Sequence, residues 1–123
     1  MTVYGILSGV LGFLAVAFGA FGAHALKSKV SDSDLVIWHT AVQYQFYHAL
    51  ALGLVILLNE RVHAKYLWWA GALFVFGSVV FSGSLYTLVL TQQRWLGAVT
   101  PLGGLAFLAG WLCFILSWIK NDT

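Results

Sequence analysis

The chain has 123 residues, of which 61% are hydrophobic and only 8% are charged, and its formal net charge is +2. Soluble globular proteins carry charged side chains at about a quarter of their positions, so this composition excludes a soluble fold and indicates a single membrane domain over residues 1–123. The basic residues are few and dispersed, which excludes a nucleic-acid-binding surface.

The charged residues are confined to three connectors and the C-terminal tail. They are Lys27, Lys29, Asp32 and Asp34; Glu60, Arg61 and Lys65; Arg94; and Lys120 and Asp122. Four uncharged stretches lie between them, at residues 1–26, 35–59, 66–93 and 95–119. Each reaches the roughly 20 residues that a helix needs to cross a hydrocarbon core of about 30 Å. The sequence therefore predicts an all-α, four-helix transmembrane bundle, up-down-up-down, with both termini on one side.

The orientation of this bundle is only weakly indicated by the basic residues. Three lysine or arginine residues fall on each side of the predicted membrane. If the first helix determines the orientation, the basic residues at its end, Lys27 and Lys29, favour a cytoplasmic location for the first connector, which puts the termini outside.

Small residues recur every three or four positions in the first and fourth segments. The first set is Gly5, Ser8, Gly12, Ala15, Gly19 and Gly22; the second is Gly103, Ala106, Gly110, Cys113 and Ser117. Such seams let helix backbones approach closely in lipid. We therefore expect the first and fourth helices to pack along Gly12 and Gly110, with a homo-oligomer interface as the alternative. Cys113, the single cysteine, is read as a small packing residue and can form no intrachain disulfide.

The second segment carries the most informative pattern of the chain. The sequence Ser31-Asp32-Ser33-Asp34 offers a side-chain cap for a helix that begins near Leu35. Two adjacent polar rows follow on that helix, His39, Gln43 and Tyr47 in one and Thr40, Tyr44 and His48 in the other. Polar side chains within a membrane span are costly unless they find partners, so this cluster is the candidate ligand-binding site.

Two accounts of the cluster remain open. In the first, its six residues line a wet pocket that reaches from one interface to about mid-bilayer, where a neutral His48 donates from one ring nitrogen and accepts at the other. In the second, they form a dry network with side chains of neighbouring helices, which would be His24, Ser78, Ser82 and Tyr86. Gln45 lies roughly opposite Gln43, so polar character extends beyond one face.

The last two segments give local structural signals. Ser78, Ser82 and Tyr86 share one row of the third helix, and serines there commonly return a hydrogen bond to a carbonyl one turn back. Thr100-Pro101 predicts the start of the fourth helix, with threonine as its cap. Residues 95–99 are then either an interfacial turn or a kinked extension of that helix.

Four ordered motifs carry a resemblance to a known family. They are Gly19-Ala20-Phe21-Gly22-Ala23-His24-Ala25-Leu26, Trp38-His39-Thr40-Ala41-Val42-Gln43-Tyr44-Gln45-Phe46-Tyr47-His48-Ala49-Leu50, Phe81-Ser82-Gly83-Ser84-Leu85-Tyr86 and Thr100-Pro101-Leu102-Gly103-Gly104. The chain resembles the YgdD/YwdK-like family, small four-helix inner-membrane proteins of bacteria with no assigned activity. The resemblance implies the fold and the membrane location, but no reaction. The chain departs from the family pattern at Gln92, where glycine is expected.

The residues also restrict the chemistry. No carboxylate lies within a predicted span and no His-x-x-His or Cys-x-x-Cys spacing occurs, so we expect neither a metal nor another cofactor. No base-and-orienter set for nucleophilic catalysis is recognisable, so no catalytic residue is assigned and a membrane enzyme is not favoured.

Two other classes of function remain beside the enzyme. The favoured one binds or translocates a small solute, a proton or a lipid at the polar cluster. The other is a structural or accessory subunit with no ligand of its own. The expected partners are membrane lipid, a second copy of the chain and a small molecule whose identity the residues do not specify.

Overall fold

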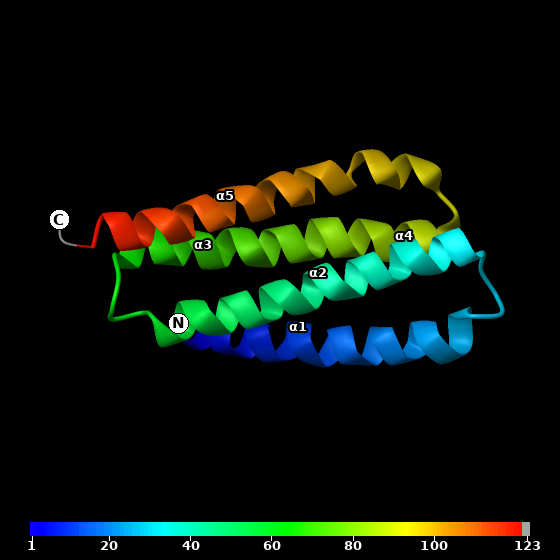
Figure 1. The fold of residues 1–123 in the computed structure, drawn as a ribbon, viewed down its shortest axis with the longest axis horizontal. Helices are drawn as coiled ribbons and strands as arrows, with labels where there is room; N and C mark the ends of the chain where they lie inside the picture. Colours follow the sequence, from blue (N-terminus) through cyan, green and yellow to red (C-terminus); the bar gives the residue numbers. More distant parts are fainter. Residues whose placement is uncertain (122–123) are drawn as a thin grey trace.

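The computed structural model describes residues 1–121, so Asp122 lies outside the described residues. Four helical spans run antiparallel to their sequence neighbours (Figure 1). They cover Thr2–Leu26, Asp32–Leu57, Ala64–Thr91 and Arg94–Ile119, and each is long and apolar enough to cross a membrane. The first span begins and the fourth ends at the same end of the bundle. The predicted all-α, four-helix fold is thereby confirmed.

The spans consist of eight helical elements. In chain order these are α1 (Thr2–Phe21), the π-helical turn η1 (Gly22–Leu26), α2 (Asp32–Leu57), α3 (Ala64–Gly77), the π-helical turn η2 (Ser78–Ser82), α4 (Gly83–Thr91), the 3₁₀ helix η3 (Arg94–Ala98) and α5 (Thr100–Ile119). The third span is thus one continuous helix with a π turn near its middle, and such turns locally change the direction in which side chains point.

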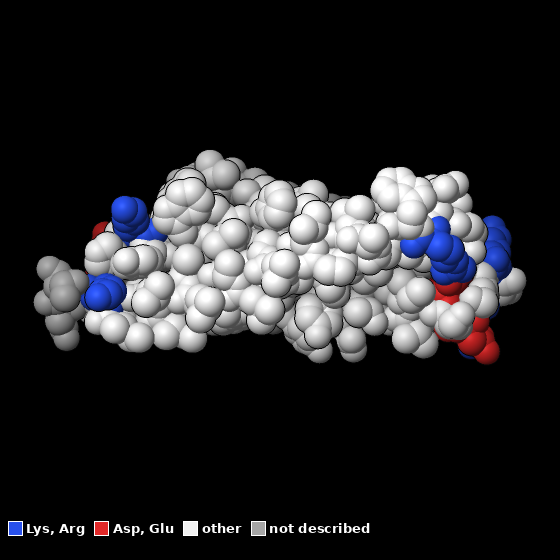
Figure 2. All heavy atoms as spheres, turned by 90° about the horizontal axis from the view of Figure 1, so that it is seen from above, with Lys and Arg blue, Asp and Glu red and all other residues white. Residues whose placement is uncertain are grey.

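The charged side chains divide the surface as the sequence predicts. In Figure 2 lysine, arginine, aspartate and glutamate gather at the two ends of the long axis, and the surface between them carries none of these on the face shown. Helical spans of 25 to 28 residues connect the two charged ends. A bundle of this kind can place its uncharged middle in hydrocarbon and its ends in water.

The helix starts agree with the sequence only in part. Ser31 caps α2, because its hydroxyl accepts from the backbone N–H of Asp34 at 3.1 Å, but the helix begins at Asp32 and not near Leu35. α5 begins at Thr100 as expected, whereas the prediction that threonine caps it is wrong. The Thr100 hydroxyl is instead hydrogen-bonded to that of Ser84 at 2.6 Å, and residues 94–98 form the separate helix η3.

The prediction that the first and fourth spans pack along their seams is also wrong. α1 packs along α2 and α5 packs along α3, so the two seams lie at opposite edges of the bundle (Figure 1). Gly110 faces the ring of Phe74 in α3, at 2.8 Å from where a β-carbon would stand. Gly103 lies against the backbone of Phe81. The α5 seam is therefore filled by the third span, its neighbour through a short turn.

α2 packs against the α1 seam in the same way, except at Gly12. Gly19 lies beside Val42, and Gly5 lies beside Ile56. Gly12 faces open space, with no atom within 4 Å of where a β-carbon would stand. Spacing alone showed that each seam has a partner helix, but it did not show which helix, because the same small residues fit any close neighbour.

The apolar core is divided into two clusters along the long axis. One lies toward the termini and includes Leu52, Val55, Leu67 and Phe74. The other lies toward the opposite end and includes Trp38, together with three other buried residues, Leu26, Leu88 and Val89. The part of α2 between residues 41 and 48, which lies between these clusters, holds two buried polar side chains, Gln45 and His48.

The turn between α4 and η3 gives the physical reason for expecting glycine at position 92. Gln92 ends α4 with φ 60°, in the left-handed region, and it is the only non-glycine residue among the described ones with positive φ. Glycine adopts this conformation without steric cost, which is the physical reason to expect it there. In this chain the position instead carries a side chain that forms hydrogen bonds with three residues, described below.

Candidate functional site

The buried polar layer is centred on Gln45, a residue that the sequence did not place in the site. Its side chain is only 4% exposed. The amide nitrogen donates to the Leu11 carbonyl at 2.8 Å, and the amide oxygen accepts from the Tyr86 hydroxyl at 2.6 Å. One side chain of α2 therefore joins α1 and α4, and each side-chain polar atom of Gln45 has a partner.

The serines of the third span behave in two different ways. Ser78 donates to the Phe74 carbonyl at 2.8 Å, the bond back along its own helix that the sequence predicts. Ser82 donates across the bundle to the Ala41 carbonyl in α2, at 2.7 Å. Both hydroxyls are buried, and neither is left free to meet a ligand.

His48 is enclosed by protein. Its ring is 4% exposed and stacks on Phe107, with 3.6 Å between ring centroids. The indole N–H of Trp111 donates to Nε2 at 3.1 Å, and Nδ1 lies 2.8 Å from the Tyr44 carbonyl. Because an indole can only donate and a carbonyl can only accept, the ring is neutral with its proton on Nδ1. This is the division of roles expected from the sequence, with Trp111 as a partner that the sequence did not identify.

A groove on the lipid-facing side lies between α2 and α5. Its volume is about 700 Å³. It is lined mainly by apolar and aromatic side chains, and its residues are Thr40, Tyr44, His48, Phe81, Pro101, Gly104, Leu105, Phe107, Leu108 and Trp111. The Thr40 hydroxyl donates back to the Val36 carbonyl at 2.9 Å. The Tyr44 side chain is 40% exposed, and its hydroxyl has no hydrogen bond to any described residue.

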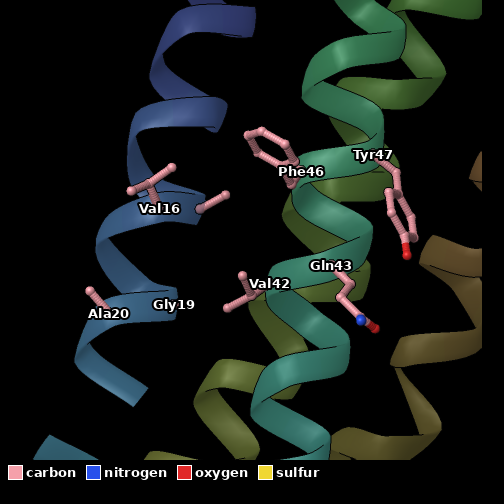
Figure 3. Close-up of a pocket in the computed structure, with 8 residues that line it drawn as sticks. Val16, Gly19, Ala20, Val42, Gln43, Phe46 and Tyr47 are labelled. Atoms are coloured by element: carbon pink, nitrogen blue, oxygen red, sulfur yellow. The ribbon is translucent and has the colours of Figure 1, made fainter. Parts of the chain in front are cut away.

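The other polar row of α2 points elsewhere. Gln43 and Tyr47 line a second groove, between α1 and α2, together with the apolar residues Ala15, Val16, Gly19, Ala20, Val42 and Phe46. Figure 3 shows the Phe46 ring directed toward α1, whereas the side chains of Gln43 and Tyr47 project from the opposite side of α2. His39 is exposed and lines neither groove.

The six predicted site residues are thus divided between two surfaces. Thr40, Tyr44 and His48 face α5, and the row of His39, Gln43 and Tyr47 faces outward. Of the four neighbours predicted to support them, Tyr86 and Ser82 bond to residues of α2 other than these six, and Ser78 bonds within its own helix. His24 is exposed in η1, outside the buried layer.

A second polar cluster joins the ends of two spans and was not predicted. The Asp34 carboxylate is almost fully buried. It accepts hydrogen bonds from both terminal nitrogens of Arg94, at 2.8 and 3.2 Å. Gln92 donates to the same carboxylate at 2.9 Å and to the Val89 carbonyl at 2.7 Å, while its oxygen accepts from Arg94. The charges were visible in the sequence, but nothing local indicated that residues 60 positions apart would meet.

Within residues 1–121, the structure brings together no group of three histidine, cysteine, aspartate or glutamate side chains that could hold a metal ion. The fold and the two α2 surfaces define a multi-pass membrane protein of the four-span class with a hydrogen-bonded polar layer at its centre.

Comparison with known proteins places the chain in a family. Residues 18–104 match the family described as "Protein of unknown function (DUF423)". A UPF0382 membrane protein of Staphylococcus epidermidis is 49% identical over 120 residues, 98% of each chain. The UPF0382 membrane protein YwdK of Bacillus subtilis is 46% identical over 121 residues, again 98% of each chain. No solved structure matches. The chain belongs to this family of membrane proteins, and the resemblance read from its motifs is confirmed.

Proposed function

We propose that this protein binds the hydrocarbon part of a lipid in the groove between α2 and α5. The observation that carries the proposal is the groove itself, with about 700 Å³ of space lined by aromatic and aliphatic side chains. Ligand sites are typically clefts of about 300–1,000 Å³ with apolar walls and a few polar groups. Here Thr40 and Tyr44 supply those polar groups.

The direction of the groove fits an extended chain. Its lining residues follow α2 from Thr40 to His48 and α5 from Pro101 to Trp111. Ten residues of helix rise about 15 Å, which is half of a hydrocarbon core of about 30 Å. Leu105 and Leu108 on the rim are 62% and 63% exposed, so the groove is open toward the bilayer. A lipid chain can therefore enter it sideways without passing through water.

The buried polar layer favours binding over translocation of a proton or a solute. Gln45, His48 and Ser82 have protein partners for their hydrogen-bonding atoms. Apolar clusters lie on both sides of this layer along the bundle axis. A translocation path would instead need a chain of free polar groups or water reaching both ends.

The test is retention of lipid by the purified protein. We expect native mass spectrometry of protein released from phosphatidylethanolamine and phosphatidylglycerol nanodiscs to show bound lipid. Leu108→Trp fills the groove and should remove most of it, while Leu112→Trp should keep it, because Leu112 is a similarly exposed α5 residue, at 60%, that does not line the groove. Equal retention by both variants would overturn the proposal.

A further inference from the structure

Three polar side chains on the outer side of α2 have no hydrogen bond to any described residue. These are His39, Gln43 and Tyr47, which recur every four residues and are all exposed. The buried side chains show the opposite pattern, since among the described residues only Nδ1 of His63 is a buried polar side-chain atom without a partner. The protein satisfies its polar groups where the chain covers them and leaves this row uncovered.

The position of the row makes this costly for an isolated chain. Gln43 lies close to the middle of the 26-residue helix α2, so a membrane-spanning α2 holds its amide near the centre of the hydrocarbon. An amide there has no water to bond with, and a polar group without a partner in hydrocarbon is strongly disfavoured. Glutamine and histidine side chains in membrane helices typically bond across to another helix.

We infer that this row is the centre of a contact between two copies of the chain. A two-fold axis along the membrane normal keeps both copies in the same orientation and brings Gln43 of each to the same depth. A glutamine amide carries both donors and an acceptor, so it complements itself across such an axis. The pairing satisfies both amides at once, which no lipid chain can do. The contact lies next to the proposed lipid groove, because the ring of Tyr47 packs edge-on against Tyr44, but Gln43 does not line that groove and its pairing does not depend on it.

The apolar residues that continue the row fit the same partner. After Tyr47 come Leu50, Leu54 and Leu57, at intervals of three or four residues, and each is at least 46% exposed. Side chains spaced in this way along one helix pack against a parallel helix, and a single polar residue in such a seam fixes its register.

The first experiment measures association in lipid. Copies labelled with donor or acceptor dyes are reconstituted together in phosphatidylcholine vesicles, and energy transfer is followed as the protein is diluted with lipid. We expect a dimer whose dissociation constant rises about tenfold or more in Gln43→Leu and stays close to the original value in Gln43→Asn. Wild-type protein that is monomeric at all dilutions, or a dimer unchanged by Gln43→Leu, would overturn the inference.

The second experiment locates the contact. In a Cys113→Ala background, oxidation should cross-link Leu50→Cys between copies and leave Leu112→Cys uncrosslinked, although the two leucines are 58% and 60% exposed. Leu54→Cys provides a second position on the same seam if Leu50→Cys does not fold. Equal cross-linking at Leu50 and Leu112 would indicate random collision and would contradict the proposed surface.

Discussion

Gln43 and Gln45 lie two residues apart on one helix, yet the structure treats them in opposite ways. Gln45 is buried, and its amide bonds to α1 and α4. Gln43 faces outward and has no hydrogen bond to any described residue. A rotation of about 200° around the helix axis separates the two side chains. The difference teaches that the helix face, and not the residue type, decides whether a polar side chain holds this bundle together or is available to a partner.

The largest expected effect comes from removing the inward glutamine. Gln45→Leu leaves the Tyr86 hydroxyl without its acceptor, so we expect the free energy of unfolding to fall by about 2 kcal/mol. The measurement is reversible unfolding in mixed micelles with increasing sodium dodecyl sulfate. Gln43→Leu is the matched control on the outward face. If Gln45→Leu is as stable as this control, the buried hydrogen bonds of Gln45 contribute nothing to the free energy of unfolding.

A smaller effect is expected from the other end of the same bond. Tyr86→Phe removes one hydroxyl and keeps the ring packed against Trp38 and Phe18, so the loss should be about 1 kcal/mol. In the same unfolding assay, the double variant with Gln45→Leu should be little less stable than Gln45→Leu alone, because the shared bond is already gone. Fully additive losses would mean that the two side chains do not act as a pair.

The smallest effect is expected from the outward glutamine. Gln43→Leu breaks no hydrogen bond within the chain, so the free energy of unfolding of the monomer should change by less than about 0.5 kcal/mol. The assay is performed at protein-to-detergent ratios that keep the chains apart. Gln43→Leu should therefore weaken association in vesicles without weakening the fold, and a loss of stability like that of Gln45→Leu would remove the contrast between the two residues.

The sequence predicted what depends on composition and helical period, and it missed what depends on neighbours. Charge spacing located the four spans, and the polar residues of α2 were recognised as unusual for a membrane helix. The prediction then treated six side chains as one site, because a helical wheel gives directions but does not show which direction faces α5 and which faces lipid. Gln45 was left out for the same reason, since its partners Leu11 and Tyr86 come from distant segments.

The two seams of small residues illustrate the same difference. Their spacing correctly indicated close helix packing, as the contacts of Gly103 and Gly110 with the third span show. The choice of partner depended on which helices lie side by side, and the short connectors favoured sequence neighbours over the α1–α5 contact that we expected. The ion pair of Asp34 and Arg94 could not be predicted for a related reason, because it depends on two span ends meeting in three dimensions.

That ion pair also has a consequence for the order in which the protein is assembled. The ribosome delivers Asp34 to the membrane 60 residues ahead of Arg94. During that interval the first two helices can already be inserted, but the carboxylate has no guanidinium and must remain hydrated at the membrane surface. Only the emergence of the residues that lead into the fourth helix allows Asp34 to be covered. The chain thus carries a closing step that waits until residue 94 of 123 has been synthesised.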